Sequence, residues 1–391
     1  MSTGPARIRD AGAEFIRDEA SGGIALLAAT GLAILWANLA APGGYFEFWG
    51  RELTLGTGSL SITEDLQHWI NDALMAIFFF VVGLEIKREL AVGELNERRK
   101  AALPIFAALG GVLLPGVIYL AFNNGTAAAG GWAIPMATDI AFAIAVMALF
   151  GKRLPSGVRL LLLTIAIVDD LIAILIIAAF YTDSLDLAWG GLIIAGVAIV
   201  LLQQRLGITR SVAYVPAGLL IWLGFFEAGI HATLAGVLLG LLTPARPFHG
   251  RMVIEDLEHR LHPWSAMVVV PLFALANAGI VLDGGVIAEA VRSGLFWGIV
   301  AGLVAGKFLG IGGACTLVSR VGIGSAPAGV RNDHIWGIAA LGGIGFTVSL
   351  FVTGLAFDDP ATIETAKLGI FAGSLLSALS GSLLLLRASR R

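Results

Sequence analysis

Charged residues are scarce in this chain. Only 14% of its 391 residues are Asp, Glu, Lys or Arg, whereas 57% are hydrophobic, and the mean hydropathy is +0.88. Because soluble domains carry about a quarter charged residues, this composition excludes an ordinary soluble protein. It predicts a polytopic helical membrane protein embedded in a lipid bilayer. The net charge of −3 gives no indication of nucleic acid as a partner.

Few cysteines and the lack of common catalytic motifs limit the functions that this chain can have. A single cysteine, Cys315, excludes an intrachain disulfide. The sequence has no HExxH motif, no Cys/His cluster and no Walker loop, so neither a zinc enzyme nor an ATP-driven pump is indicated, and we expect no cofactor. Residues 1–23 mix Arg with Asp and Glu and lack the apolar core of a signal peptide. They predict a short helix on the cytoplasmic surface before the first span.

Apolar runs of about the length that spans a bilayer recur along the whole chain. They predict a single all-α integral membrane domain over 1–391 with about twelve transmembrane helices. Their approximate cores are 24–40, 66–84, 101–121, 132–150, 157–180, 188–204, 212–225, 229–243, 263–281, 294–318, 335–356 and 366–386. Of the 25 Lys and Arg residues, 21 lie at the termini or in the loops on the same side, and three lie in the opposite loops. The positive-inside rule therefore predicts cytoplasmic N- and C-termini.

The segment 45–62 contains the one predicted piece of β-structure. Residues 51–62, RELTLGTGSLSI, alternate apolar and polar side chains around a Gly-rich turn, which is typical of a β-hairpin. An exposed hairpin edge favours pairing with a second copy, so we expect a homodimer through this external hairpin. An ordinary capped loop is the alternative interpretation.

Two of the predicted spans are interrupted. The fourth run carries Pro135 and Asp139, and the eleventh carries three central glycines, Gly342, Gly343 and Gly345. Backbone groups freed by Gly and Pro are tolerated in a membrane only beside protein or water. The triplets of helices 3–5 (101–180) and 10–12 (294–388) run in opposite senses. They predict an inverted-repeat core whose interrupted helices 4 and 11 cross at mid-membrane, with 188–281 as interface helices.

Close packing is the alternative explanation for glycines within spans. It suits four glycines spaced by four residues in the tenth run, namely Gly298, Gly302, Gly306 and Gly310. It does not explain the acidic residue in the fourth run.

Four ionisable residues lie deep within the predicted spans: Asp139, Asp169, Asp170 and Lys307. A buried polar group can simply hold helices together. Charges at this depth, however, each cost a few kcal/mol and usually mark a functional site. Adjacent helical positions point about 100° apart, so Asp169 and Asp170 are expected to face different surroundings.

The chemistry of this set favours a cation exchanger. Carboxylates, the Thr138 hydroxyl and freed backbone carbonyls would form an all-oxygen site, which suits a hard cation. Burial favours the protonated form of a carboxyl group. A carboxylate that binds either a proton or a cation would therefore couple the two fluxes by competition.

Eight sequence motifs carry a resemblance to a known family. The chain resembles the NhaA family of sodium/proton antiporters over nearly its whole length, in NDALMAIFFFVVGLEIKREL (71–90), IPMATDIAFA (134–143), IAIVDDL (165–171), GIHATLAGVLLG (229–240), LEHRLHPW (257–264), PLFALANAG (271–279), GKFLGI (306–311) and LGGIGFTVSLF (341–351). The resemblance implies electrogenic exchange of cytoplasmic Na⁺ or Li⁺ for external protons in the bacterial inner membrane, activated at alkaline pH.

The resemblance also implies roles for the deep residues. Asp170 is implied as the primary cation ligand, with Asp169 beside it and Thr138 as a further oxygen ligand. Lys307 is implied to pair with Asp169, and Asp139 to offset the positive N-terminal ends of the interrupted helices. The protons would be carried by Asp169 with Asp170 or by Asp170 with Lys307, and the motifs do not decide between these pairs.

A pH response is implied at the cytoplasmic end. The matching positions are Glu85, Arg88, Glu258, His259 and His262, and histidine titrates near neutrality. A solvated charged face is the alternative reading of this cluster. His231 is a further pH-sensing candidate, although a hydrogen-bonded packing role suits a histidine on an apolar face. Asn71 and Asp72 open the second span, where capping alone explains them.

Two other functions compete with an antiporter. An intramembrane aspartyl protease needs two Asp on different spans, which Asp139 and Asp170 would provide, but the GxGD context is absent and Asp169 and Lys307 are left unexplained. A cation channel is disfavoured because a lysine at depth obstructs cations and inverted repeats are typical of carriers.

Overall fold

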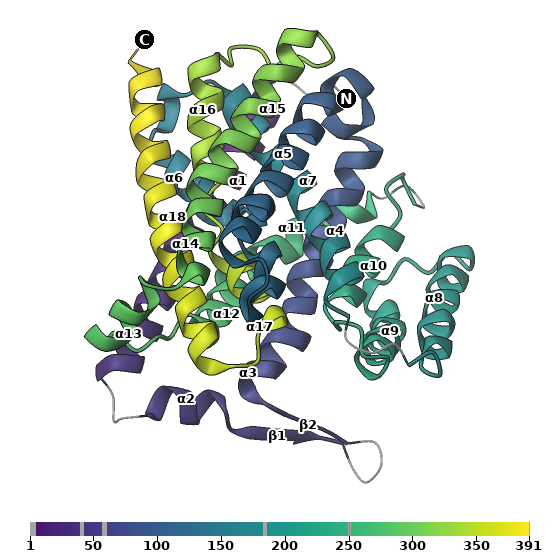
Figure 1. Ribbon diagram of the computed structural model, residues 1–391. Helices are drawn as coiled ribbons and strands as arrows, with labels where there is room; N and C mark the ends of the chain where they lie inside the picture. Colours follow the sequence, from purple (N-terminus) through teal and green to yellow (C-terminus); the bar gives the residue numbers. More distant parts are fainter. Residues whose placement is uncertain are drawn as a thin grey trace.

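The computed structural model describes residues 5–39, 43–56, 61–182, 186–248, 250 and 252–390. Its long helices lie side by side in one bundle, with a small two-stranded sheet at one end (Figure 1). The predicted helical class is therefore confirmed. The N and C labels lie at one end of the bundle, and the sheet lies at the other end (Figure 1).

The elements of the first half of the chain alternate long helices with short irregular turns. In chain order they are α1 (Pro5–Leu39), α2 (Gly44–Trp49), β1 (Glu52–Leu55), β2 (Ile62–Asp65), α3 (Leu66–Trp69), η2 (Ile70–Leu74), α4 (Met75–Ala91), η3 (Glu94–Asn96), α5 (Arg98–Asn123), η4 (Ala127–Met136), α6 (Ile140–Ala148), η5 (Gly151–Arg153) and α7 (Ser156–Phe180).

The second half is also helical throughout its described elements. They are α8 (Gly190–Arg205), η6 (Ser211–Tyr214), α9 (Val215–Glu227), α10 (Leu234–Leu242), α11 (Val253–Trp264), η7 (Ser265–Val269), α12 (Val270–Asn277), α13 (Gly284–Ala290), α14 (Gly294–Ala301), η8 (Gly302–Gly306), α15 (Lys307–Val321), α16 (Asn332–Leu341), α17 (Phe346–Ala356) and α18 (Pro360–Ser389). Among these, η7 and η8 are π-helical turns, as is η2 in the first half.

Six helical segments of the described chain are long and apolar enough to cross a membrane. They are Ser21–Leu39, Leu66–Ala91, Arg99–Asn123, Ser156–Phe180, Gly294–Val321 and Pro360–Ser389. Two further pairs of helices reach this length together, which gives up to eight spans in this part of the chain. The predicted seventh and eighth runs form the shorter helices α9 and α10, which are separated at Gly229, where φ is +73°.

The two predicted interruptions are present. η4 and α6 are bent by 43° at residues 137–139, and α16 and α17 are bent by 43° at residues 342–345. η4 is a 3-10 helix that contains Pro135, a residue without a backbone N–H for a helical hydrogen bond. Each bent pair therefore presents free backbone groups near its break.

The glycines of the tenth predicted run allow close helix packing, as their spacing indicates. A Cβ atom on Gly306 would lie 2.7 Å from the Pro115 Cα of α5, and one on Gly310 would clash with the Gly110 carbonyl oxygen. One on Gly302 would lie 2.7 Å from the Pro135 Cβ of η4. This contact brings Lys307, which follows η8, into the middle of the bundle.

The predicted hairpin is confirmed as a two-stranded antiparallel sheet. β1 pairs with β2 in a register that places Leu55 opposite Ile62. The strands continue to Asp65, whereas residues 45–49 of the predicted segment 45–62 belong to the helix α2 instead. The predicted turn at 57–60 lies outside the described residues. At the N-terminus, the predicted surface helix and first span form one continuous helix, α1, and residues 1–4 lie outside the description.

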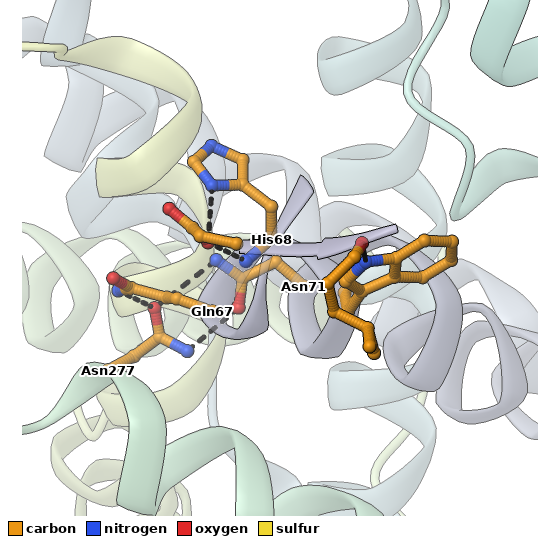
Figure 2. A network of polar contacts seen from close by, with 7 residues as sticks. Gln67, His68, Asn71 and Asn277 are labelled. Carbon is orange, nitrogen blue, oxygen red and sulfur yellow. Dashed lines mark hydrogen bonds and ion pairs between the residues drawn. The ribbon is translucent and has the colours of Figure 1, made fainter. Parts of the chain in front are cut away.

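The second strand is joined to the bundle by polar side chains (Figure 2). Asp65 caps α3 by accepting a hydrogen bond of 2.7 Å from the His68 backbone N–H. Gln67 donates to the Asn277 Oδ1 atom at 2.9 Å, and Asn277 donates to the Asn71 Oδ1 atom at 2.8 Å. The prediction that Asn71 and Asp72 cap the second span is therefore wrong. Asp65 caps the helix, while Asn71 ties the second span to the end of α12.

Candidate functional site

The breaks in the two bent helix pairs contact each other directly. The Asp139 backbone N–H donates to the Ile344 carbonyl oxygen at 2.6 Å, and the Thr138 hydroxyl donates to the Gly342 carbonyl oxygen at 2.8 Å. Each segment therefore satisfies backbone groups that the other leaves free. This contact brings residues about 200 positions apart in the sequence into one site.

The Asp139 carboxylate joins the N-termini of two half-helices. Its Oδ1 atom caps α6 by accepting from the Phe142 backbone N–H at 2.9 Å. Its Oδ2 atom accepts from the backbone N–H of Thr347 at 3.0 Å and from the hydroxyl of the same residue at 2.7 Å, in the first turn of α17. A negative charge at this point is stabilised by both helix dipoles. Since Asp139 is 2% exposed, these donors explain how a carboxylate is accommodated there.

Asp169 on α7 forms a buried ion pair with Lys307 at the start of α15. The Lys307 Nζ atom lies 2.6 Å from the Asp169 Oδ2 atom and donates to the Thr138 hydroxyl at 3.1 Å. Lys307 is fully buried and Asp169 is 1% exposed. The π-helical turn η8 immediately precedes Lys307, and such turns are frequent at functional sites. The ion pair implied by the family resemblance is thus present in the structure.

Asp170 faces a different environment from its neighbour. It lines a cavity of about 60 Å³ together with Thr138, Asp139, Glu85 and Ser265. Asp170 is 6% exposed, and its Oδ1 atom has no hydrogen-bond partner among the described residues. The cavity exceeds the volume of about 30 Å³ that one water molecule occupies. A buried, unpartnered carboxylate oxygen beside hydroxyl oxygens can bind a small hard cation or a proton.

Only part of the predicted pH-sensing cluster surrounds this cavity. Glu85 on α4 and His262 on α11 line it. Arg88, one helical turn after Glu85, pairs with Glu258 through an Nη1–Oε1 distance of 2.6 Å. The His259 side chain is exposed, and none of the described contacts joins it to these residues.

His231 lies elsewhere. Its Nε2 atom is 2.5 Å from the Tyr181 carbonyl oxygen, at the C-terminal end of α7, and His231 does not line the cavity. Tyr181 follows Asp170 by eleven residues, which corresponds to about 16 Å along a helix. This position matches the packing interpretation of His231.

Three hydroxyl-bearing residues of the site were missed by the sequence analysis. Thr347 binds Asp139, Ser349 donates to the Ile134 carbonyl oxygen at 2.7 Å, and Ser265 lines the cavity. Thr347 and Ser349 follow directly after the glycine interruption in GIGFTVS. Hydroxyl groups next to a helix break are the signal that could have identified them.

Comparisons with known proteins identify the family. The model of the Na⁺/H⁺ antiporter 1 family matches residues 13–385. The chain belongs to this family. It is 43% identical to the Na⁺/H⁺ antiporter NhaA 2 of Sorangium cellulosum (strain So ce56), over 93% of this chain and 87% of that protein. It is 46% identical to the NhaA antiporters of Salmonella paratyphi A and Escherichia coli O1:K1 / APEC, over 94% of this chain and 95% of theirs. These relatives are named as transporters and not as enzymes, which disfavours the protease alternative.

Proposed function

We propose that this chain exchanges Na⁺ for H⁺ across the membrane and that Asp170 is the residue for which the two ions compete. Membership of the antiporter family supports the exchange itself. The observation that carries the site assignment is the unpartnered Oδ1 atom of the buried Asp170, at the cavity beside the two helix breaks. A buried carboxylate oxygen without a donor is costly in free energy, and either a proton or a cation relieves that cost.

The other deep residues have complementary proposed roles. Thr138 and Asp169 supply further oxygens for the cation, and Lys307 is the counter-charge that holds Asp169 when the cation is absent. Asp139 positions the two half-helices through the three hydrogen bonds that it accepts. Two protons per cation, carried by Asp169 with Asp170 or by Asp170 with Lys307, would make the exchange electrogenic.

The proposed membrane architecture has twelve spans with cytoplasmic termini in the bacterial inner membrane. Its core is an inverted repeat of 101–180 and 294–388, whose interrupted helices cross at mid-membrane, and 188–281 forms the interface helices. The equal bends of 43° in the two interrupted pairs support this repeat. Both termini are labelled at the same end of the bundle in Figure 1, which supports placing them on the same side of the membrane.

We further propose Li⁺ as a second transported cation and a homodimer formed through the hairpin segment 45–62. All four residues of β1 are exposed, so this strand has an edge available for pairing.

Inside-out membrane vesicles containing this chain test the proposed exchange. Respiration acidifies their interior, and addition of NaCl is expected to collapse the pH gradient, measured with a fluorescent pH probe. KCl serves as the control salt. A saturable response to Na⁺ and Li⁺ is expected, whereas a sodium current without proton movement would indicate a channel, and no response to NaCl would contradict the exchange.

We propose that Glu85, Arg88, Glu258, His259 and His262 set the pH response of transport. The contacts that support this proposal are the Arg88–Glu258 ion pair and the presence of Glu85 and His262 at the ion cavity. A change of charge on Glu258 alters the partner of Arg88, which lies one turn from Glu85. His231 remains a weaker candidate because its position is remote from this cluster.

Glu258→Gln should change how stability depends on pH. Burial raises the pKa of the Glu258 carboxyl above its ordinary value, although Arg88 and His262 lower it, with Glu89 and Glu255 raising it slightly. A raised pKa means that the folded state binds the proton more tightly than the unfolded state. Wild-type stability should therefore fall, relative to Glu258→Gln, as the pH rises from below 4.5 through the raised pKa. The wild type should lose about 1.4 kcal/mol of its free energy of unfolding, relative to the variant, for each pH unit by which folding raises the Glu258 pKa.

Thermal unfolding of both proteins between pH 4 and 9 measures this effect. Asp256→Asn is the matched control, because its side chain is exposed on the same helix. A stability difference that stays constant over this range would contradict the role of Glu258 as a group that titrates within it.

A further inference from the structure

A second cavity lies apart from the ion site, on the outside of the bundle. Its volume is about 270 Å³, and it is lined by three helices, α15, α16 and α18, through Phe308, Asp333, Trp336, Leu384, Arg387 and Ala388. The half-helix α16 has ten residues and packs between the longer α15 and α18 (Figure 1). We call this cavity the outer groove. None of its lining residues contributes to the ion site described above.

One part of the outer groove is apolar and aromatic. The rings of Phe308 and Trp336 lie 4.7 Å apart between centroids, and Leu384 lines the groove beside them. On the flanking helices, Leu309 is 50% exposed and Leu383 is 58% exposed. Since α15 and α18 belong to candidate membrane spans, these surfaces face lipid acyl chains.

The other part of the outer groove is basic. The Arg387 side chain is exposed in the last turn of α18, and none of the described residues forms a hydrogen bond or ion pair with it. Arg331 donates to the Ala388 carbonyl oxygen at 2.6 Å, which places a second guanidinium group at the same end. Arg390 is also exposed there. Among the described residues at this end, Asp333 offsets one of the three guanidinium groups of Arg331, Arg387 and Arg390, so the local charge remains positive.

We propose that the outer groove binds one phospholipid with an anionic headgroup. The lipid phosphate would lie at Arg387, and one acyl chain would cover Phe308, Trp336 and Leu384. Basic pockets between transmembrane helices attract anionic lipid headgroups electrostatically. A groove of this size with a mainly apolar lining offers few polar partners to water. A soluble anion would use the basic part alone, whereas a phospholipid matches both parts.

The position of the groove links its occupant to the transport site. Phe308 directly follows Lys307, so the two side chains leave the same helical turn in different directions. Lys307 points to Asp169, and Phe308 points to Trp336 in the groove. A lipid that packs on Phe308 therefore contacts the turn that carries the buried lysine.

Lipid binding to the full-length, delipidated protein tests this proposal. Phosphatidylglycerol and phosphatidylcholine with identical acyl chains are added in neutral detergent, and bound lipid is counted by native mass spectrometry alongside the thermal unfolding midpoint. Phosphatidylglycerol is expected to bind more tightly and to raise the midpoint more. Arg387→Gln should weaken phosphatidylglycerol binding about fivefold and phosphatidylcholine binding less, because the choline ammonium already offsets the phosphate charge. Leu384→Trp should fill the groove and weaken both lipids.

Arg320→Gln is the matched control, since Arg320 is an exposed guanidinium in the last turn of α15 outside the groove. It should leave the preference for phosphatidylglycerol intact. Equal losses in Arg387→Gln and Arg320→Gln, or no preference in the wild type, would overturn the proposal. In a final experiment, inorganic phosphate is added without lipid. If it raises the thermal unfolding midpoint as much as phosphatidylglycerol does, no acyl chain is needed for binding and the proposal is overturned. If Leu384→Trp does not fold, the two arginine variants decide.

Discussion

Asp170→Asn is expected to abolish Na⁺-dependent proton release from inside-out vesicles. The substitution keeps the size of the side chain but removes its charge and its ability to exchange a proton for a cation. Replacing a buried carboxylate ligand with a neutral amide should weaken cation binding by about 3 kcal/mol or more, which is at least about a hundredfold in affinity. Because the same group is proposed to bind the proton, the variant should lose turnover as well as affinity. Raising NaCl into the molar range should therefore not restore the response.

Two companion variants separate this effect from a folding defect. Asp256→Asn neutralises an exposed carboxylate on α11 and should leave the vesicle response unchanged. Asp170→Glu keeps the charge in a cavity of about 60 Å³ and should retain exchange with an altered Na⁺ affinity. The thermal unfolding midpoint of Asp170→Asn should match or exceed that of the wild type, since a buried charge whose Oδ1 atom lacks a partner is removed. Exchange that survives in this variant would exclude Asp170 as the essential ligand.

The residues that the sequence alone identified are those whose presence in an apolar run is costly. Asp139, Asp169, Asp170 and Lys307 stand out because each is a charge within a hydrophobic segment. The 100° angle between adjacent helical positions was enough to predict different surroundings for the two adjacent acids. The structure places one against Lys307 and the other at the cavity.

What the sequence did not disclose depends on contacts between distant segments. Thr347 is an ordinary residue in an apolar stretch, and its role follows from lying beside Asp139, 208 positions away. The amide group of Asn277 meets Asn71 for the same reason (Figure 2). The difference between His262 and the exposed His259 depends on the rotation of α11, which a motif of alternating charged and apolar residues leaves open. Local sequence patterns show which residues are energetically unfavourable in an apolar segment and which helical positions share a face. The hydrogen-bond partners of a side chain depend instead on how the helices pack in the bundle.

Breaking the Asp169–Lys307 pair from one side should destabilise the protein strongly. Asp169→Asn leaves the fully buried Lys307 ammonium without its counter-charge, with the neutral Asn amide oxygen and the Thr138 hydroxyl as its acceptors. Removing one member of a buried ion pair typically costs about 3–5 kcal/mol, because the other charge stays desolvated without compensation. Lys307→Gln should likewise destabilise, since the Asp169 Oδ1 atom already lacks a partner and Oδ2 would lose its donor.

The double variant Asp169→Asn, Lys307→Gln should regain most of this loss. With both charges removed, the amide groups can hydrogen-bond across the same gap, and replacing a whole buried pair is often nearly neutral in stability. Thermal unfolding of the wild type, both single variants and the double variant forms a complete cycle, and the coupling between the two sites should exceed about 2 kcal/mol. Additive losses would mean that the 2.6 Å contact carries no coupling. Protonation of Asp169 would then have no energetic effect on Lys307 in the other repeat. The counter-charge role proposed for that lysine would be contradicted.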